Sequence, residues 1–124
     1  MEFTEAVRPI GSLWILAEAS PDFGGQPYTY LMTLGYDPTQ KAFVGTWVDT
    51  MQTHLWRYRG TLDASGKILT LMTEGPAFGD PNQIIEYRDV IRVKSRDHRI
   101  FTSQTLGQDG EWLTFMTAEY RRKR

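Results

Sequence analysis

Residues 54–63 read His-Leu-Trp-Arg-Tyr-Arg-Gly-Thr-Leu-Asp, a stretch in which aromatic or apolar side chains alternate with polar ones. Successive side chains of an extended chain point to opposite faces, so His54, Trp56 and Tyr58 share one face and the arginines share the other. This period of two predicts a β-strand whose aromatic face points inward.

Segments of the same kind recur along the whole chain, between turns rich in Gly, Asp, Asn and Pro. The turns fall at residues 21–25, 37–40, 63–66, 79–82, 95–97 and 108–110. The segments between them predict nine strands, at residues 3–9, 12–19, 27–36, 42–50, 54–63, 67–74, 84–95, 98–106 and 112–121. Since no stretch has a helical period, we expect one all-β domain over residues 1–124, an antiparallel meander arranged as a barrel or sandwich.

The composition limits the classes of protein to which the chain can belong. It has 124 residues, a formal charge of −1 and no Cys, which excludes disulfides, thiol catalysis and Cys-ligated metals. With 40% hydrophobic and 13% aromatic residues it can form a core, which excludes a disordered protein. No apolar run reaches the roughly 18 residues of a membrane span, and no secretion signal opens the sequence. We therefore expect a cytoplasmic protein with no membrane partner.

A basic run ends the sequence: Arg121, Arg122, Lys123 and Arg124. It could form a patch for nucleic acid or anionic lipid, but we interpret it as a solvated tail. Because the chain as a whole is nearly neutral, we expect no nucleic-acid partner.

Three polar residues fall on faces that otherwise read as interior: Asp49, His54 and Asp89. An unpaired buried carboxylate is costly, so each of these groups needs a hydrogen-bond donor or a solvated cavity. In one interpretation they lie near strand ends and pair with arginines or backbone N–H groups. In the other they line a pocket with Trp47 and Trp56 and orient a ligand.

Motifs for catalysis and metal binding are weak. Ser103, His54 and Asp89 are the residue types of a hydrolase triad, but no nucleophile elbow surrounds Ser103. His54 and His98 lie far apart in the sequence and lack the spacing of metal ligands. We expect no metal and no cofactor, and we expect His98, which follows a turn, to be exposed.

Two of the predicted strands, residues 42–50 and 112–121, carry apolar side chains on both faces. A strand of this kind is normally covered on both faces. We expect a terminal segment or a partner chain to supply the outer cover.

Several blocks of sequence, taken together, resemble one family. They are Leu34-Gly35-Tyr36-Asp37-Pro38, residues 44–51 and 54–63, Glu74-Gly75-Pro76, Tyr87-Arg88-Asp89-Val90 and Asp109-Gly110-Glu111-Trp112. The chain is similar over most of its length to a widespread bacterial family of uncharacterised proteins with a lipocalin-like, calycin-type β-barrel. The resemblance implies a barrel or half-barrel of about nine strands and no particular activity, although related barrels bind small apolar ligands or haem.

Members of that family usually carry further residues at the N-terminus, including the first strands of the barrel. Here the first predicted strand begins almost at once, so we expect an incomplete barrel with an exposed edge. An exposed edge is an aggregation hazard unless something covers it. We therefore expect a homodimer in which two chains cover this edge.

We expect the function to be the binding of a small apolar or aromatic ligand in the lumen of the barrel. The predicted ligand-binding residues are Trp47, Asp49, Met51, His54, Trp56, Tyr58, Asp89 and Met116. One alternative is a small-substrate isomerase, cyclase or hydrolase that uses Asp49, Asp89 and His54. Another is a structural or interaction protein that binds no ligand.

Overall fold

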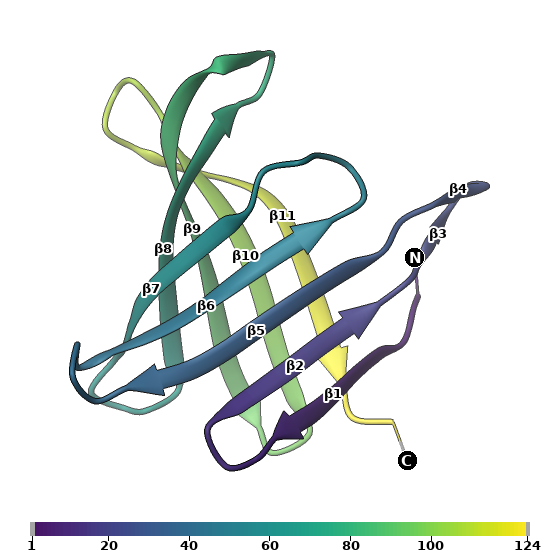
Figure 1. The fold of residues 1–124 in the computed structure, drawn as a ribbon, viewed down its shortest axis with the longest axis vertical. Helices are drawn as coiled ribbons and strands as arrows, with labels where there is room; N and C mark the ends of the chain where they lie inside the picture. The colour runs from purple at the N-terminus through teal and green to yellow at the C-terminus, as the bar shows by residue number, and fades with distance from the viewer. Residues whose placement is uncertain (1, 124) are drawn as a thin grey trace. The chain divides into compact units, whose positions relative to one another are not determined.

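The computed structural model describes residues 2–123, and all of the regular structure in this range is β-strand (Figure 1). The strands are β1 (Glu5–Ile10), β2 (Trp14–Ala19), β3 (Asp22–Phe23), β4 (Gln26–Pro27), β5 (Tyr30–Asp37), β6 (Ala42–Asp49), β7 (Trp56–Leu62), β8 (Ile68–Ala77), β9 (Asp80–Ser95), β10 (His98–Leu106) and β11 (Trp112–Arg121). Nine of them form one antiparallel sheet in the order β1-β2-β5-β6-β7-β8-β9-β10-β11. This confirms the predicted all-β class, the antiparallel pairing and the nine main strands.

The remaining two strands, β3 and β4, form a separate hairpin that the sequence analysis predicted only as a turn. Gly24 and Gly25 connect them, and both have positive φ angles, of 61° and 89°. Two successive residues of this kind make the tight turn that suits a two-residue hairpin. Each strand is only two residues long, which is too short for alternation to reveal it.

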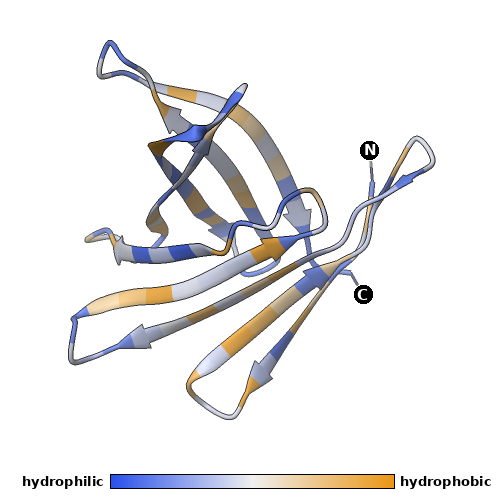
Figure 2. Cartoon of the chain, turned by 45° about the horizontal axis from the view of Figure 1, so that its top comes forward, coloured by the Kyte–Doolittle hydropathy of each residue, from blue (hydrophilic) through white to orange (hydrophobic). Residues whose placement is uncertain are grey.

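The chain divides into two compact units, one ending at Tyr58 and one beginning at Arg59. In the first unit, β2, β5 and β6 bury a face that includes Ala17, Tyr30 and Met32. The strands approach closely at Gly45, where a Cβ atom would lie 2.0 Å from the carbonyl oxygen of Thr33. Figure 2 shows the hydrophobic residues as separate bands along the strands, as alternation requires.

The second unit is a meander in which β8, β9, β10 and β11 pair in chain order. Its core contains Leu69, Leu71, Tyr87 and Phe101, and Leu71 is fully buried. The register of β10 and β11 shifts between Ser103 and Gln104, which forms a bulge on β11.

Burial does not follow strict alternation everywhere. Leu62 lies on the face of residues 54–63 that was predicted to point inward, but it is exposed; on β9, Val93 is exposed while Val90 is buried. Val90 lies between Thr70 and Thr102 in the middle of the unit, where β9 has a neighbour on each side, whereas Val93 lies near the end of the strand.

The expected cover over both faces of residues 112–121 is also missing within the chain. Leu113, Phe115 and Met116 of β11 are exposed. β11 is also the last strand in the order and pairs with β10 on one side only, so its other edge is open.

Candidate functional site

Trp47 and Asp49 lie on the same face of β6, as alternation predicted, and they are hydrogen-bonded to each other. The indole Nε1 of Trp47 donates to Asp49 Oδ2 at 3.0 Å, and the hydroxyl of Tyr28 donates to the same oxygen at 3.0 Å. The backbone N–H of Met51 donates to Asp49 Oδ1 at 2.9 Å. Both carboxylate oxygens therefore accept hydrogen bonds from the protein itself, which fits the interpretation of Asp49 as a paired carboxylate near a strand end.

An aromatic cluster surrounds this carboxylate in the first unit. The ring of Tyr30 stacks on Trp47, with centroids 4.4 Å apart and an interplanar angle of 14°. The buried Tyr30 donates its hydroxyl to Glu5 Oε2 at 2.5 Å, so a second carboxylate faces the cluster. Tyr28, Tyr30 and Glu5 were not among the residues predicted from the sequence. The pairing register of β5 and β6 would identify Tyr30, because it places Tyr30 directly opposite Asp49.

The other predicted residues of the first unit have different environments. His54 packs edge-on against Trp56, with ring centroids 4.7 Å apart, and Tyr58 is buried. Met51 is 77% exposed. The structure thus brings Trp47 together with Asp49 and His54 together with Trp56, while the side chain of Met51 lies in solvent.

Asp89 and Met116 belong to the second unit, where Ser103 lies between them on the middle strand β10. The Ser103 hydroxyl is buried and donates to Asp89 Oδ1 at 2.7 Å. This bond satisfies one oxygen of Asp89. The acceptor of the Ser103 hydroxyl is thus a carboxylate and not a histidine, the usual base of a serine nucleophile.

Buried hydroxyl groups lie on both sides of Tyr87, next to this pair. Thr73 on β8 and Thr105 on β10 are directly opposite Tyr87, and neither of their hydroxyl oxygens has a hydrogen-bond partner. Burial raises the pKa of the Tyr87 phenol, so the phenol stays protonated and donates to the carbonyl oxygen of Pro76.

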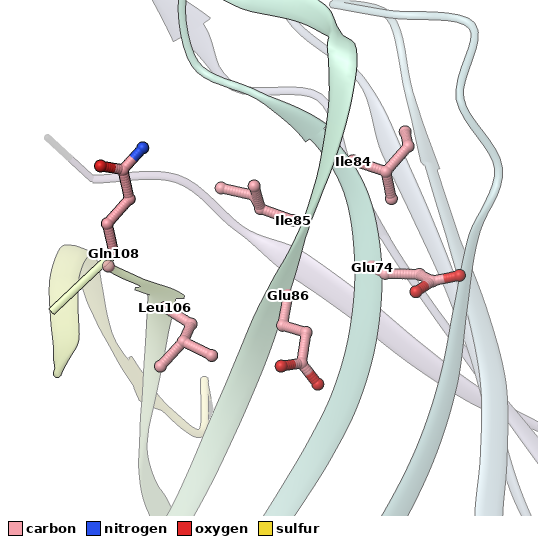
Figure 3. A pocket seen from close by; sticks show the side chains of 7 residues that line it. Glu74, Ile84, Ile85, Glu86, Leu106 and Gln108 are labelled. Atoms are coloured by element: carbon pink, nitrogen blue, oxygen red, sulfur yellow. The ribbon is translucent and has the colours of Figure 1, made fainter. Parts of the chain in front are cut away.

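The second unit also contains a shallow depression of about 290 Å³ at one end of β8, β9 and β10 (Figure 3). Apolar and polar side chains both line it: Ile84, Ile85 and Leu106, with Glu74, Glu86, Gln108 and the backbone of Gly107. None of the eight residues predicted from the sequence lines this depression.

The charge at the depression is negative. Glu74 on β8 lies directly opposite Glu86 on β9, and like charges in this position repel. The nearest arginine of the same strand, Arg88, donates to Gln104 and lies over the ring of Trp112, 4.2 Å from its centroid. The guanidinium group is therefore committed to other partners, and the depression can accept a cationic or hydrogen-bond-donating group.

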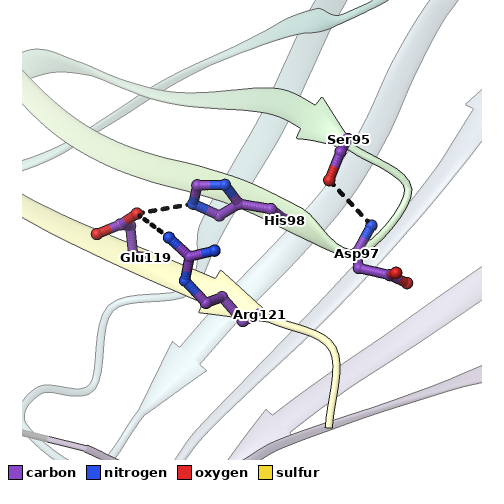
Figure 4. A network of polar contacts seen from close by, with 5 residues as sticks. All are labelled: Ser95, Asp97, His98, Glu119 and Arg121. Atoms are coloured by element: carbon purple, nitrogen blue, oxygen red, sulfur yellow. Dashed lines mark hydrogen bonds and ion pairs between the residues drawn. The ribbon is translucent and has the colours of Figure 1, made fainter. Parts of the chain in front are cut away.

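A second polar network occupies the start of β10 and the end of β11 (Figure 4). His98 Nε2 lies 2.7 Å from Glu119 Oε1, and Arg121 contacts the same oxygen at 3.4 Å. The His98 side chain is only 18% exposed, so its predicted exposure was wrong. The reason is that His98 lies within β10, opposite Arg121, and not in the turn that precedes the strand.

Between residues 2 and 123, no three His, Asp or Glu side chains lie close enough together to hold a metal ion. The same range contains no helix that is long and apolar enough to cross a membrane.

Comparison with known protein families identifies the family of this chain. The model of a family described as "Protein of unknown function (DUF1579)" matches residues 1–122. No curated protein matches the chain.

Proposed function

The chain belongs to the DUF1579 family of proteins of unknown function, and we propose that it binds a small molecule with an apolar or aromatic body and a cationic or hydrogen-bond-donating head. The observation that carries this proposal is the depression of the second unit, where Ile84, Ile85 and Leu106 lie beside two opposed carboxylates. Small-molecule sites commonly combine apolar walls with a few polar groups that fix orientation.

The size and charge of the depression narrow the class of ligand. Its volume of about 290 Å³ suits a molecule of one or two rings. A cation in the depression gains attractive contacts with the carboxylates of Glu74 and Glu86. An anionic ligand of the same shape meets two like charges and is disfavoured.

The residues predicted from the sequence offer a rival location. Trp47, Asp49, Met51, His54, Trp56 and Tyr58 all belong to the first unit, where Trp47 and Tyr30 present stacked rings. We favour the depression, because the oxygens of Asp49 already accept three hydrogen bonds from the protein.

The test uses three probes that share one ring system: 1-naphthylmethylammonium, 1-naphthylmethanol and 1-naphthoate. We expect fluorescence titrations to give the tightest binding for the cation, weaker binding for the alcohol and the weakest for the carboxylate. Substitution of Glu86 by Gln should lower the affinity for the cation about three- to tenfold and leave the affinity for the alcohol unchanged. Glu111→Gln is the matched control, because Glu111 is an exposed glutamate of the same unit outside the depression.

Equal affinity for the three probes would show that the carboxylates take no part in binding. If none of the three probes bound, the proposed ligand site would be refuted.

A further inference from the structure

The two end strands of the sheet order differ in how well their edges are protected. β1 is six residues long and contains Pro9, which has no N–H group and blocks the addition of another strand. β11 is ten residues long and contains neither Pro nor Gly. Its protection is one bulge, at the register shift opposite Ser103 and Gln104.

The surface of β11 is apolar at its centre. Leu113 is 65% exposed, Phe115 46% and Met116 38%. Phe115 also contacts the exposed ring of Phe78, with centroids 5.0 Å apart, so the apolar surface continues onto the turn between β8 and β9. A long edge strand with exposed apolar side chains is a site of association with another chain.

The charges at the two ends of β11 indicate which chain that is. Asp109 and Glu111 precede the strand, and Arg121, Arg122 and Lys123 end or follow it. The Arg121 side chain is 70% exposed and contacts Glu119 at 3.4 Å, and the 61% exposed Arg122 contacts Asp97 at 2.8 Å, so both guanidinium groups keep an accessible side for a further carboxylate. When a second copy of β11 runs antiparallel to the first, the acidic end of each strand meets the basic end of the other. The strand is therefore complementary to itself in charge and in its apolar centre.

We propose that two copies of the chain associate through β11, antiparallel and side by side, and form a homodimer. With Glu111 of each copy opposite Arg121 of the other, Met116 lies opposite its own counterpart at the middle of the paired strands, with Phe115 beside it, and two sets of opposite charges flank them. The basic C-terminal run then has a role in pairing the two chains. The proposal is independent of ligand binding at the depression.

The first experiment measures the mass of the wild-type protein in solution by light scattering at about 10–100 μM. We expect twice the 14.3 kDa of one chain. Met116→Lys should give the monomer, because it places two like charges opposite each other at the middle of the paired strands. Leu13→Lys is the matched control, since Leu13 is 73% exposed in the turn between β1 and β2, and it should leave the dimer intact.

A charge exchange tests the orientation of the two strands. Glu111→Lys and Arg121→Glu should each weaken the dimer about tenfold, and the double variant should recover most of the loss. Circular dichroism confirms that each variant is folded. A wild-type monomer at 100 μM would overturn the proposal, as would dissociation by Leu13→Lys in place of Met116→Lys. Failure of the double variant to recover would overturn the antiparallel arrangement.

Discussion

The hydroxyl group of Thr105 should make the protein less stable than a methyl group would. Its oxygen is buried opposite Tyr87 without a hydrogen-bond partner, and Thr73 is in the same position on the other side. A buried hydroxyl without a partner costs roughly 1–3 kcal/mol relative to water. Thr105→Val replaces this oxygen by a methyl group and keeps the β-branched shape that suits a strand.

We expect Thr105→Val to raise the free energy of unfolding by about 1 kcal/mol, after a small allowance for repacking. For a chain of 124 residues this corresponds to a rise in Tm of about 3–5 °C. Urea unfolding, followed by tryptophan fluorescence and circular dichroism, measures the change. The protein concentration is held constant, because association would add to the apparent stability.

Thr33→Val is the matched control, since it makes the same chemical change where the hydroxyl is bonded. Thr33 Oγ1 lies 2.7 Å from the hydroxyl of Thr46 and accepts a hydrogen bond from the backbone N–H of Thr46 at 3.0 Å. We expect the control to lower the free energy of unfolding by about 1–2 kcal/mol. If Thr105→Val lowers it by the same amount, the Thr105 hydroxyl has a partner in solution and the reasoning is refuted.

Three further predictions concern other parts of the chain. Gly45→Ala should lower the free energy of unfolding, measured with urea, by about 3 kcal/mol or more, because the Cβ of the alanine would meet the backbone oxygen of Thr33. A decrease of less than about 1 kcal/mol would contradict the close approach of the two strands. The Ser65 hydroxyl, with neighbouring backbone N–H groups, lowers the pKa of Asp63 from 3.8. The ionised carboxylate of Asp63 therefore stabilises the folded protein above the unfolded pKa, and this stabilisation is lost as the pH falls through the folded pKa. A ¹³C NMR titration should show a midpoint below 3.8 that rises in Ser65→Ala, and an unchanged midpoint would refute this. Trp56→Ala should leave the affinity for 1-naphthylmethylammonium within about twofold, because Trp56 does not line the depression; a lost affinity would favour the site predicted from the sequence.

The period-two pattern was sufficient to predict the strands and the face that Trp47 and Asp49 share. It placed Trp47 and Asp49 on one face of β6, where the structure joins them by a hydrogen bond. It did not identify Tyr28 as the third member, because Tyr28 comes from a different part of the chain and reaches Asp49 only through the pairing of β5 with β6. Alternation assigns faces within one strand, whereas contacts across strands depend on the register.

The depression also depends on the register between strands, which alternation within one strand does not determine. Glu74 and Glu86 become neighbours because β8 and β9 form one long hairpin, and alternation alone does not identify which residues lie opposite each other. A shift of the hairpin register by one residue would separate the two carboxylates. The exposed face of β11 was also beyond the sequence pattern, since the apolar side chains predict cover without indicating which chain supplies it.

The most direct test of ligand binding is a ¹⁵N–¹H NMR titration of the labelled protein with 1-naphthylmethylammonium, which resolves even weak binding residue by residue. Our account predicts saturable shifts that are largest at the amides of Glu74, residues 84–86 and residues 106–108, around the depression. Saturable shifts confined to residues 28–58, or no saturable shifts at all, would contradict it.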